Sequence, residues 1–351
     1  LYVARQDGGA AFMAEAYGKA TGKPGICFVT RGPGATNASI GVHTAFQDST
    51  PMILFIGQVG GDMVDREAFQ EIDYRRMFGQ MTKWVTQIDR AERIPEYVAR
   101  AFQIACSGRP GPVVLALPED MLIESVDVTD AQKVVCAKNR PTAKSIKEVQ
   151  VLFEQSKKPL VILGGSGWSE RACELVKTFA ENNQLPVGCS FRRQDLFDNH
   201  HSNYVGDIGI GINPRLADMV KESDLLLVLG ARLGEMTTSG YTLVEAPTPK
   251  QRLIHIHPGL EELGRVFQGS VLINSDIEEA VDALVSMPAM EPNWKTWLKD
   301  GRENYLKNLI PQSSPGLVDL GQVMVAFKDL LPSDAVITNG AGNFSGWIHR
   351  H

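Results

Sequence analysis

Short apolar runs alternate with amphipathic stretches along the first third of the chain. The runs are rich in residues that favour strands and are bounded by glycine or proline, which predicts buried strands. The predicted strands are 26–29, 52–56, 83–87 and 113–117. The stretches between them repeat their apolar residues at helical spacing. The predicted helices are 9–21, 35–47 and 91–107. Strands separated by helices form mostly parallel sheets with helices on both faces, so we expect an α/β fold.

The alternation weakens at residues 124–144, which we interpret as a linker, and then resumes in a second unit. There the predicted helix is 170–182, and the predicted strands are 160–163, a short one near Val187, 225–229 and 253–256. Glycine-rich turns follow two of these strands, where ligands of doubly wound sheets bind. The second unit, 145–292, is therefore expected to be Rossmann-like.

A third unit begins near residue 293 and runs to the last residue. Its apolar spacing predicts a helix through Asn308, a helix at 317–330 and a strand at 335–338. The chain opens inside an apolar, strand-like run at 1–5 and stops within the first turns of another predicted helix. We therefore expect both ends to be cut from a longer protein.

Composition narrows the classes of protein to consider. The chain has 351 residues, a net charge of −6 and 43% hydrophobic residues, which is typical of a water-soluble protein of two or more domains. Because the sequence has no basic stripe, nucleic acid is not expected as a partner. No apolar run reaches membrane-spanning length, so no membrane partner is expected. The five cysteines form no Cys-x-x-Cys pair, which favours reduced thiols and a cytoplasmic location.

Two places carry candidate chemistry at the ends of predicted elements. The turn Gly32-Pro33-Gly34 joins a strand to a helix, and its glycines allow a ligand or another backbone to come close. Asp7 follows the first strand-like run and precedes a helix. A carboxylate there can exchange a proton with a ring nitrogen of a cofactor, or it can cap the helix by accepting its free N–H groups. From the residues alone, the cap is favoured.

Several other positions have both a functional and a structural interpretation. The amide of Gln70, beside Phe69, can hydrogen-bond a substrate carbonyl or carboxylate, but it can equally start a surface helix. His255 and His257 share one face of a predicted strand; without a third ligand at metal-binding spacing, a structural role is favoured. The turn Gly-Gly-Ser-Gly at 164–167 lacks the full dinucleotide pattern and supports NAD only weakly.

Six motifs follow one another in an order that is more specific than any of them alone. They are RQDGGAAFMA at 5–14, GPGATN at 32–37, DSTP at 48–51, GQ at 57–58, AFQE at 68–71 and RPGPV at 109–113. Together they strongly resemble the pyrimidine-binding domain of thiamine-diphosphate-dependent enzymes in the acetolactate synthase-like group. The resemblance continues through the central unit into the first part of a diphosphate-binding domain, so it covers essentially the whole chain.

The resemblance implies an architecture and an activity. It implies a pyrimidine-binding-type domain at 1–123, a central domain at 145–292 and the beginning of a diphosphate-binding-type domain at 293–351. In this family thiamine diphosphate and Mg2+ bind between domains of two subunits, which implies a homodimer or homotetramer. The cofactor decarboxylates a small 2-oxo acid, here with pyruvate as the implied donor, and the product is protonated or joined to a second carbonyl compound.

The resemblance also assigns roles to single residues. Asp7 stands at the place of the family carboxylate that bonds the aminopyrimidine ring, as a catalytic and cofactor-binding residue. Gly34 and Asn37 belong to the turn near the pyrimidine, and Phe69 and Gln70 line the substrate side, with Gln70 taking part in catalysis. The residues that match the first loop reaching the diphosphate are Gly340, Gly342 and Asn343. No metal ligand is assigned, because the family's magnesium motif would lie beyond His351.

Departures from the family pattern bear on activity and specificity. The family carboxylate is usually Glu, and Asp7 is one methylene shorter; a displacement of about 1 Å at a reacting centre can cost on the order of 100-fold in rate. Acetolactate synthases carry lysine where this chain has Glu119, although a solvated charge at a strand end is the simpler interpretation. Their Arg-Phe-Asp-Asp-Arg stretch beside FAD is Arg-Leu-Gly-Glu-Met at 232–236 here. Both changes put strict pyruvate specificity and FAD in doubt.

The leading hypothesis is an enzyme, a thiamine-diphosphate-dependent lyase or transferase of small 2-oxo acids, of which this chain is a piece. Without the magnesium motif, this chain alone is expected to hold the cofactor weakly. Oxalyl-CoA decarboxylase-like and aldehyde-lyase-like enzymes remain alternatives within the family. A non-catalytic protein that keeps the fold for binding or assembly is an alternative of another class, favoured by Asp7 and the missing motif. The hypothesis of an NAD- or FAD-dependent oxidoreductase rests only on the glycine turns.

Overall fold

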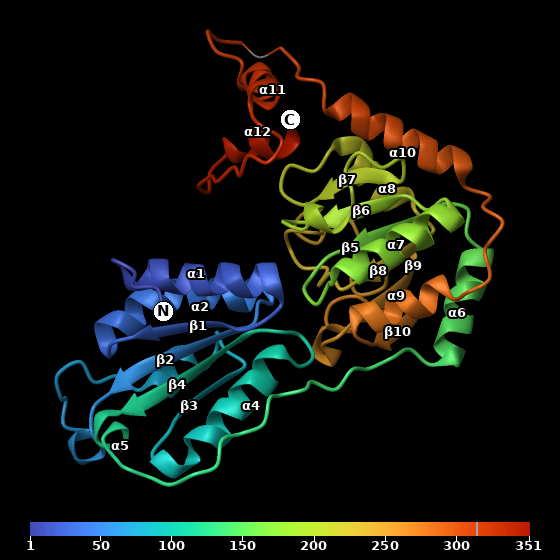
Figure 1. Cartoon of the computed structure of the whole chain (residues 1–351). Coiled ribbons are helices and arrows are strands. Elements are labelled where there is room, and N and C mark those ends of the chain that lie inside the picture. The colour runs from blue at the N-terminus through green and yellow to red at the C-terminus, as the bar shows by residue number, and fades with distance from the viewer. Residues whose placement is uncertain (314) are drawn as a thin grey trace.

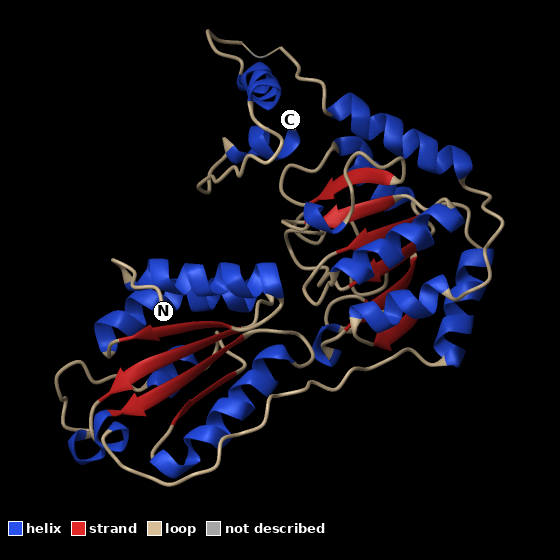
Figure 2. Ribbon diagram, in the orientation of Figure 1, coloured by secondary structure: helices blue, strands red, loops and turns tan. Residues whose placement is uncertain are grey.

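The computed structural model describes residues 1–313 and 315–351. These residues form two parallel sheets, each with helices on both faces, joined by an extended segment (Figures 1 and 2). Every strand pair in both sheets is parallel, which confirms the α/β class expected from the alternation of strands and helices. Within the described residues, no helix is long and apolar enough to cross a membrane.

The first unit is built on a four-stranded sheet in the order β1-β2-β4-β3. Its strands are β1 (Gly25–Val29), β2 (Met52–Gln58), β3 (Trp84–Gln87) and β4 (Pro112–Pro118). One face packs against α1 (Asp7–Thr21), α2 (Gly32–Asp48) and the short α3 (Tyr74–Phe78). The other packs against α4 (Ile94–Cys106), and the short α5 (Glu119–Leu122) follows β4. Because all four strands are parallel, their carboxyl ends lie at one edge of the sheet.

The central unit is built on a six-stranded sheet in the order β10-β9-β8-β5-β6-β7. Its strands are β5 (Pro159–Leu163), β6 (Val187–Ser190), β7 (Tyr204–Ile208), β8 (Leu225–Leu229), β9 (Arg252–His257) and β10 (Val271–Asn274). One face carries α6 (Ala143–Glu154), α7 (Glu170–Asn183) and α9 (Ile277–Val285), and the other carries α8 (Pro214–Glu222). The strand order changes direction between β5 and β8.

The C-terminal part contains α10 (Lys295–Asn308), α11 (Leu320–Leu330) and α12 (Ser345–Arg350). Helix α10 packs on the central unit, where Gly301 lies close to Met219 and Val205. The strand expected at 335–338 is wrong: these described residues are coil, and the side chain of Val336 is 88% exposed. The strand-like run at 1–5 is also coil, because neither segment has a neighbouring strand to take up its backbone groups.

Candidate functional site

The site predicted from the sequence maps to the edge of the first sheet where β1, β2 and β4 end. Helix α2 begins there directly after β1, with Pro33 in its first turn, so its free N–H groups point to this edge. One of them is already used, because the N–H of Gly32 donates to the carbonyl of Gln70 at 3.0 Å. A strand end next to a helix N-terminus is a favourable place for an anionic or polar ligand group.

Asp7, Gly34 and Asn37 come together at this edge. Asp7 is the first residue of α1, but the helix is capped by Gln6, whose side-chain oxygen accepts from the N–H of Gly9 at 2.7 Å. The favoured interpretation of Asp7 as the cap is therefore wrong, and its half-buried carboxylate is free for other contacts. Asn37 Nδ2 donates to Asp7 Oδ2 at 3.3 Å.

A side chain at position 34 would be tightly packed by its surroundings. A Cβ there would lie 3.0 Å from the Thr30 methyl group and 3.1 Å from Val29 Cβ. It would also lie 3.4 Å from Asp7 Oδ1, so a side chain would press on the carboxylate. The absence of a side chain at residue 34 therefore helps the first turn of α2 to lie close to Asp7.

Phe69 and Gln70 lie in the loop 59–73, between β2 and α3. The alternative that Gln70 starts a surface helix is wrong: its φ is +67°, in the left-handed region, and α3 begins four residues later. Phe69 is 79% exposed. The loop is fixed by Glu71, whose carboxylate accepts from the N–H groups of Asp65 at 2.8 Å and Ala68 at 3.0 Å. Helix α2 contacts both residues, because the N–H of Gly32 donates to the Gln70 carbonyl and Asn37 donates to Asp7.

Gly340, Gly342 and Asn343 do not join this cluster. They are exposed and lie in the segment between α11 and α12, which Figure 1 shows apart from α1 and α2. Helix α12, which follows this segment, is held to the end of α10, since Arg350 Nε donates to the Asn308 carbonyl at 2.7 Å. Within this one chain, the residues assigned to the pyrimidine and those assigned to the diphosphate therefore belong to separate places.

Sequence reasoning missed Arg31. Its Nη2 forms an ion pair with Glu119, and its Nη1 donates to the Phe69 carbonyl at 3.3 Å. The interpretation of Glu119 as a merely solvated charge is therefore wrong. The available signal was that Arg31 and Glu119 each lie two residues after a predicted strand of a parallel sheet, so that their side chains emerge at the same edge.

The two strand histidines have structural partners in the central unit. His255 Nε2 pairs with the Ala231 carbonyl at 2.8 Å, and His257 Nδ1 accepts from the Gly259 N–H at 2.9 Å. Burial lowers the pKa of each to about 4, so both rings are neutral near pH 7. Across the described residues, no group of three or more His, Cys, Asp or Glu side chains is arranged to hold a metal ion.

The glycine turns of the central unit meet where the strand order changes direction. A Cβ on Gly165 would lie 2.0 Å from the Gly230 carbonyl oxygen, so the turns after β5 and β8 are in direct contact. Polar side chains already bind this place, because Trp168 Nε1 donates to the Gly164 carbonyl at 2.8 Å and Arg193 donates to that of Gly165. These turns are therefore occupied by contacts within the chain.

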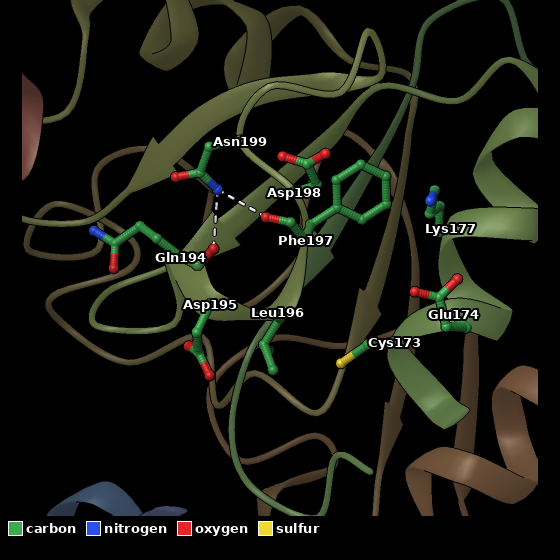
Figure 3. A pocket seen from close by; sticks show the side chains of 9 residues that line it. All are labelled: Cys173, Glu174, Lys177, Gln194, Asp195, Leu196, Phe197, Asp198 and Asn199. Carbon is green, nitrogen blue, oxygen red and sulfur yellow. Dashed lines mark hydrogen bonds between the residues drawn. The ribbon is translucent and has the colours of Figure 1, made fainter. Parts of the chain in front are cut away.

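A pocket of about 590 Å³ opens beside these turns, between α7 and the segment after β6 (Figure 3). Asn199 shapes one wall by donating to the carbonyls of Gln194 at 3.0 Å and Phe197 at 2.7 Å. None of the residues predicted for the site lines this pocket. The lining residues are Cys173, Glu174, Lys177, Gln194, Asp195, Leu196, Phe197, Asp198 and Asn199.

Two family models match the chain. Residues 1–77 match the thiamine pyrophosphate enzyme N-terminal TPP binding domain, and residues 146–284 match the thiamine pyrophosphate enzyme central domain. Together they include Asp7, Gly34, Asn37 and Gln70, and most of the six-stranded sheet.

Curated relatives extend the similarity beyond these two domains. The chain is 32% identical over 352 residues to the acetolactate synthase large subunit of Parasynechococcus marenigrum, covering 96% of this chain and 56% of the relative. It is 27% identical to the acetolactate synthase isozyme 2 large subunit of Escherichia coli (99% and 62%) and 28% identical to the acetolactate synthase large subunit of Lactococcus lactis (99% and 61%). The chain thus spans between 56% and 62% of the length of these relatives. The matched domains place this chain in the thiamine pyrophosphate enzyme family.

Proposed function

We propose that this chain provides the pyrimidine side of a thiamine diphosphate site and one wall of a 2-oxo-acid site, in an acetolactate synthase-like enzyme. The observation that carries the proposal is the cluster of Asp7, Gly34 and Asn37 at the start of α2. The cluster offers a carboxylate that no helix N–H group uses, beside a turn without side-chain bulk. The named relatives, all acetolactate synthase large subunits, support the choice of reaction.

The residues at this edge fit the aminopyrimidine part of the cofactor. Asp7 is half buried and hydrogen-bonded on one oxygen, so its other oxygen can accept from a ring N–H. Asn37 holds the carboxylate in place, and Gly34 lets the start of α2 lie close to that carboxylate. When bound, the cofactor supplies a carbon nucleophile that adds to the carbonyl of a 2-oxo acid and stabilises the charge left by decarboxylation. Gln70 would orient the substrate, and Phe69 would exclude water from it.

We further propose that the complete site forms between two copies of the subunit. Helices α1 and α2 expose a group of large apolar side chains: Phe12 (40% exposed), Met13 (53%), Tyr17 (51%) and Ile40 (55%). A surface of this kind is typical of a protein interface. Pairing through it would bring Asp7 of one subunit towards Gly340, Gly342 and Asn343 of the other, which lie apart within one chain. Magnesium ligands are not assigned to any residue of this chain.

The test is made on the protein that carries this chain, supplied with thiamine diphosphate and Mg2+. Carbon dioxide release from pyruvate, and from other small 2-oxo acids, is compared for the wild type, Asp7→Asn and Asp7→Glu. Asp7→Asn should lower the rate by at least about 100-fold, because the carboxylate is lost. Asp7→Glu should raise it, because the longer side chain shortens the distance to the ring. Asp62→Asn, an exposed carboxylate of the neighbouring loop, is the matched control.

The outcome also separates the proposal from its alternatives. An Asp7→Glu variant without any gain would count against the role of Asp7. Binding of the cofactor without turnover of any 2-oxo acid would favour the non-catalytic alternative, which the short Asp7 side chain also supports. FAD is not part of the proposal, because the stretch at 232–236 reads Arg-Leu-Gly-Glu-Met and departs from the Arg-Phe-Asp-Asp-Arg pattern of the resembled enzymes.

A further inference from the structure

Arg31 and Glu119 bridge three strand ends. Arg31 follows β1 and Glu119 follows β4, and β2 lies between these strands in the sheet. The Arg31 side chain passes over the end of β2, since a Cβ on Gly57 would lie 3.7 Å from Arg31 Cγ. The ion pair therefore spans the edge of the sheet above which the Phe69–Gln70 segment lies.

Arg31 and its neighbour bind two successive carbonyl groups of the loop. Arg31 Nη1 donates to the carbonyl of Phe69 at 3.3 Å, and the N–H of Gly32 donates to that of Gln70 at 3.0 Å. Gln70 has a φ of +67°, in the left-handed region that is unfavourable for a residue with a side chain. Such a backbone persists only where its surroundings fix it, and these two donors do so.

The turn after β4 holds the other end of the same loop. Asp120, next to Glu119, accepts from the N–H of Gly61 at 2.9 Å. The turn therefore fixes the loop at Gly61 directly and at Phe69 through Arg31. By contrast, the pair itself is too exposed to contribute much to folding, with 23% of the Arg31 side chain and 46% of the Glu119 side chain accessible.

We propose that Arg31 and Glu119 are positioning residues that hold Gln70 in its left-handed conformation and so aim its amide at the substrate. Glu119 fixes the guanidinium by pairing with Nη2, which leaves Nη1 directed at the Phe69 carbonyl. The substrate part of this inference rests on the proposed function, whereas the restraint on the loop does not.

The experiment compares amide hydrogen exchange in residues 66–72 of the wild type, Glu119→Gln and the charge-swapped variant Arg31→Glu/Glu119→Arg. Glu96→Gln is the control, because Glu96 pairs with Arg93 on the surface at the start of α4, which packs on the opposite face of the sheet from α2. Glu119→Gln should accelerate exchange about ten-fold in 66–72, the effect of losing one charge-assisted hydrogen bond. The melting temperature should stay unchanged. The charge-swapped variant restores the ion pair, but its guanidinium follows β4 instead of β1. It should therefore not restore the slow amide exchange of residues 66–72.

Kinetics then separate the inference from the proposed function. In an active protein, Glu119→Gln should raise the KM for the 2-oxo acid about ten-fold and leave the affinity for thiamine diphosphate unchanged. The positioning role would be overturned if Glu119→Gln exchanged its amides in 66–72 no faster than Glu96→Gln. It would also be overturned if the charge-swapped variant fully recovered the wild-type exchange rate. A wild type that neither binds the cofactor nor turns over a 2-oxo acid would refute the proposed function alone, because the exchange experiment needs neither.

Discussion

Replacing Arg109 by alanine is expected to destabilise the contact between the two sheets. Arg109 lies just before β4 in the first unit and is 9% exposed. Its guanidinium donates to Ser49 Oγ at 2.8 Å, to the Phe46 carbonyl at 2.6 Å and to Glu262 Oε1 at 2.9 Å. Glu262 belongs to the central unit and is 4% exposed, so this ion pair is buried between the units.

The magnitude follows from the burial of the pair. Removing one partner of a buried, hydrogen-bonded ion pair costs about 3–5 kcal/mol, because the other charge is left without compensation. Here the cost should fall near the lower end, about 3 kcal/mol, since two other cations share Glu262 Oε1. Arg265 Nη1 lies 3.0 Å from that oxygen, and Arg232 Nε lies 3.3 Å from it, without the alignment of a hydrogen bond.

The assay is equilibrium unfolding in urea, followed by tryptophan fluorescence. Arg265→Ala is the internal control, because Arg265 contacts the same carboxylate oxygen but its side chain is 55% exposed. It should cost at most about 1 kcal/mol. Equal losses for the two variants, or a loss below about 1 kcal/mol for Arg109→Ala, would refute the argument from burial.

The same carboxylate gives a pH dependence. Burial disfavours the charged form of Glu262, but the guanidinium groups of Arg232, Arg109 and Arg265 outweigh it and hold its pKa below the usual value. The unfolded chain therefore binds the proton first as the pH falls. The contribution of Glu262 is fully present above its unfolded pKa and is lost as the pH drops through the lower folded pKa. In Glu262→Gln this part of the acid dependence should disappear.

Two further predictions concern buried groups of the central unit. Burial lowers the pKa of His255 and His257 to about 4, so the unfolded chain takes up more protons between about pH 6.5 and 4. Stability should fall as the pH drops from about 6.5 to 4. His255→Gln should reduce the slope of the unfolding free energy against pH. Burial raises the pKa of Asp207 to about 7, and its Oδ1 has no hydrogen-bond partner among the described residues. Stability should therefore fall as the pH rises from about 4 to 7, and Asp207→Asn should gain about 2–4 kcal/mol in chemical unfolding at pH 8.

The sequence predicts secondary structure best for elements that depend mainly on their own residues. Strands β2 and β4 are continuous apolar runs, because both of their faces are covered by helices. The apolar run at 335–338 looks the same but forms no strand, since strand formation also needs a neighbouring strand. Strand β7 was missed because Gly206, with a φ of +127°, interrupts its apolar run. Helices α6, α8 and α9 were not predicted either.

The same distinction applies to the contacts of the candidate site and of the interface between the two units. Asp7, Gly34 and Asn37 were assigned through the resemblance of their motifs to a known family, and the structure brings the three residues together. The pairing of Arg31 with Glu119 depends on the strand order β1-β2-β4, which periodicity does not reveal. The pairing of Arg109 with Glu262 joins residues 153 positions apart in different units.

Strand β4 connects these two ion pairs, since Arg109 precedes it and Glu119 follows it. The strand is paired with β2 on one side and β3 on the other, and its register with both is continuous. A strand held on both sides cannot shift along its axis without breaking both ladders. Loosening the contact at Arg109 should therefore not reach the loop at Gln70. We expect Arg109→Ala to leave amide exchange in 66–72 at the wild-type rate while it lowers global stability. Accelerated exchange there under native conditions would show that β4 transmits the docking of the two units to the site.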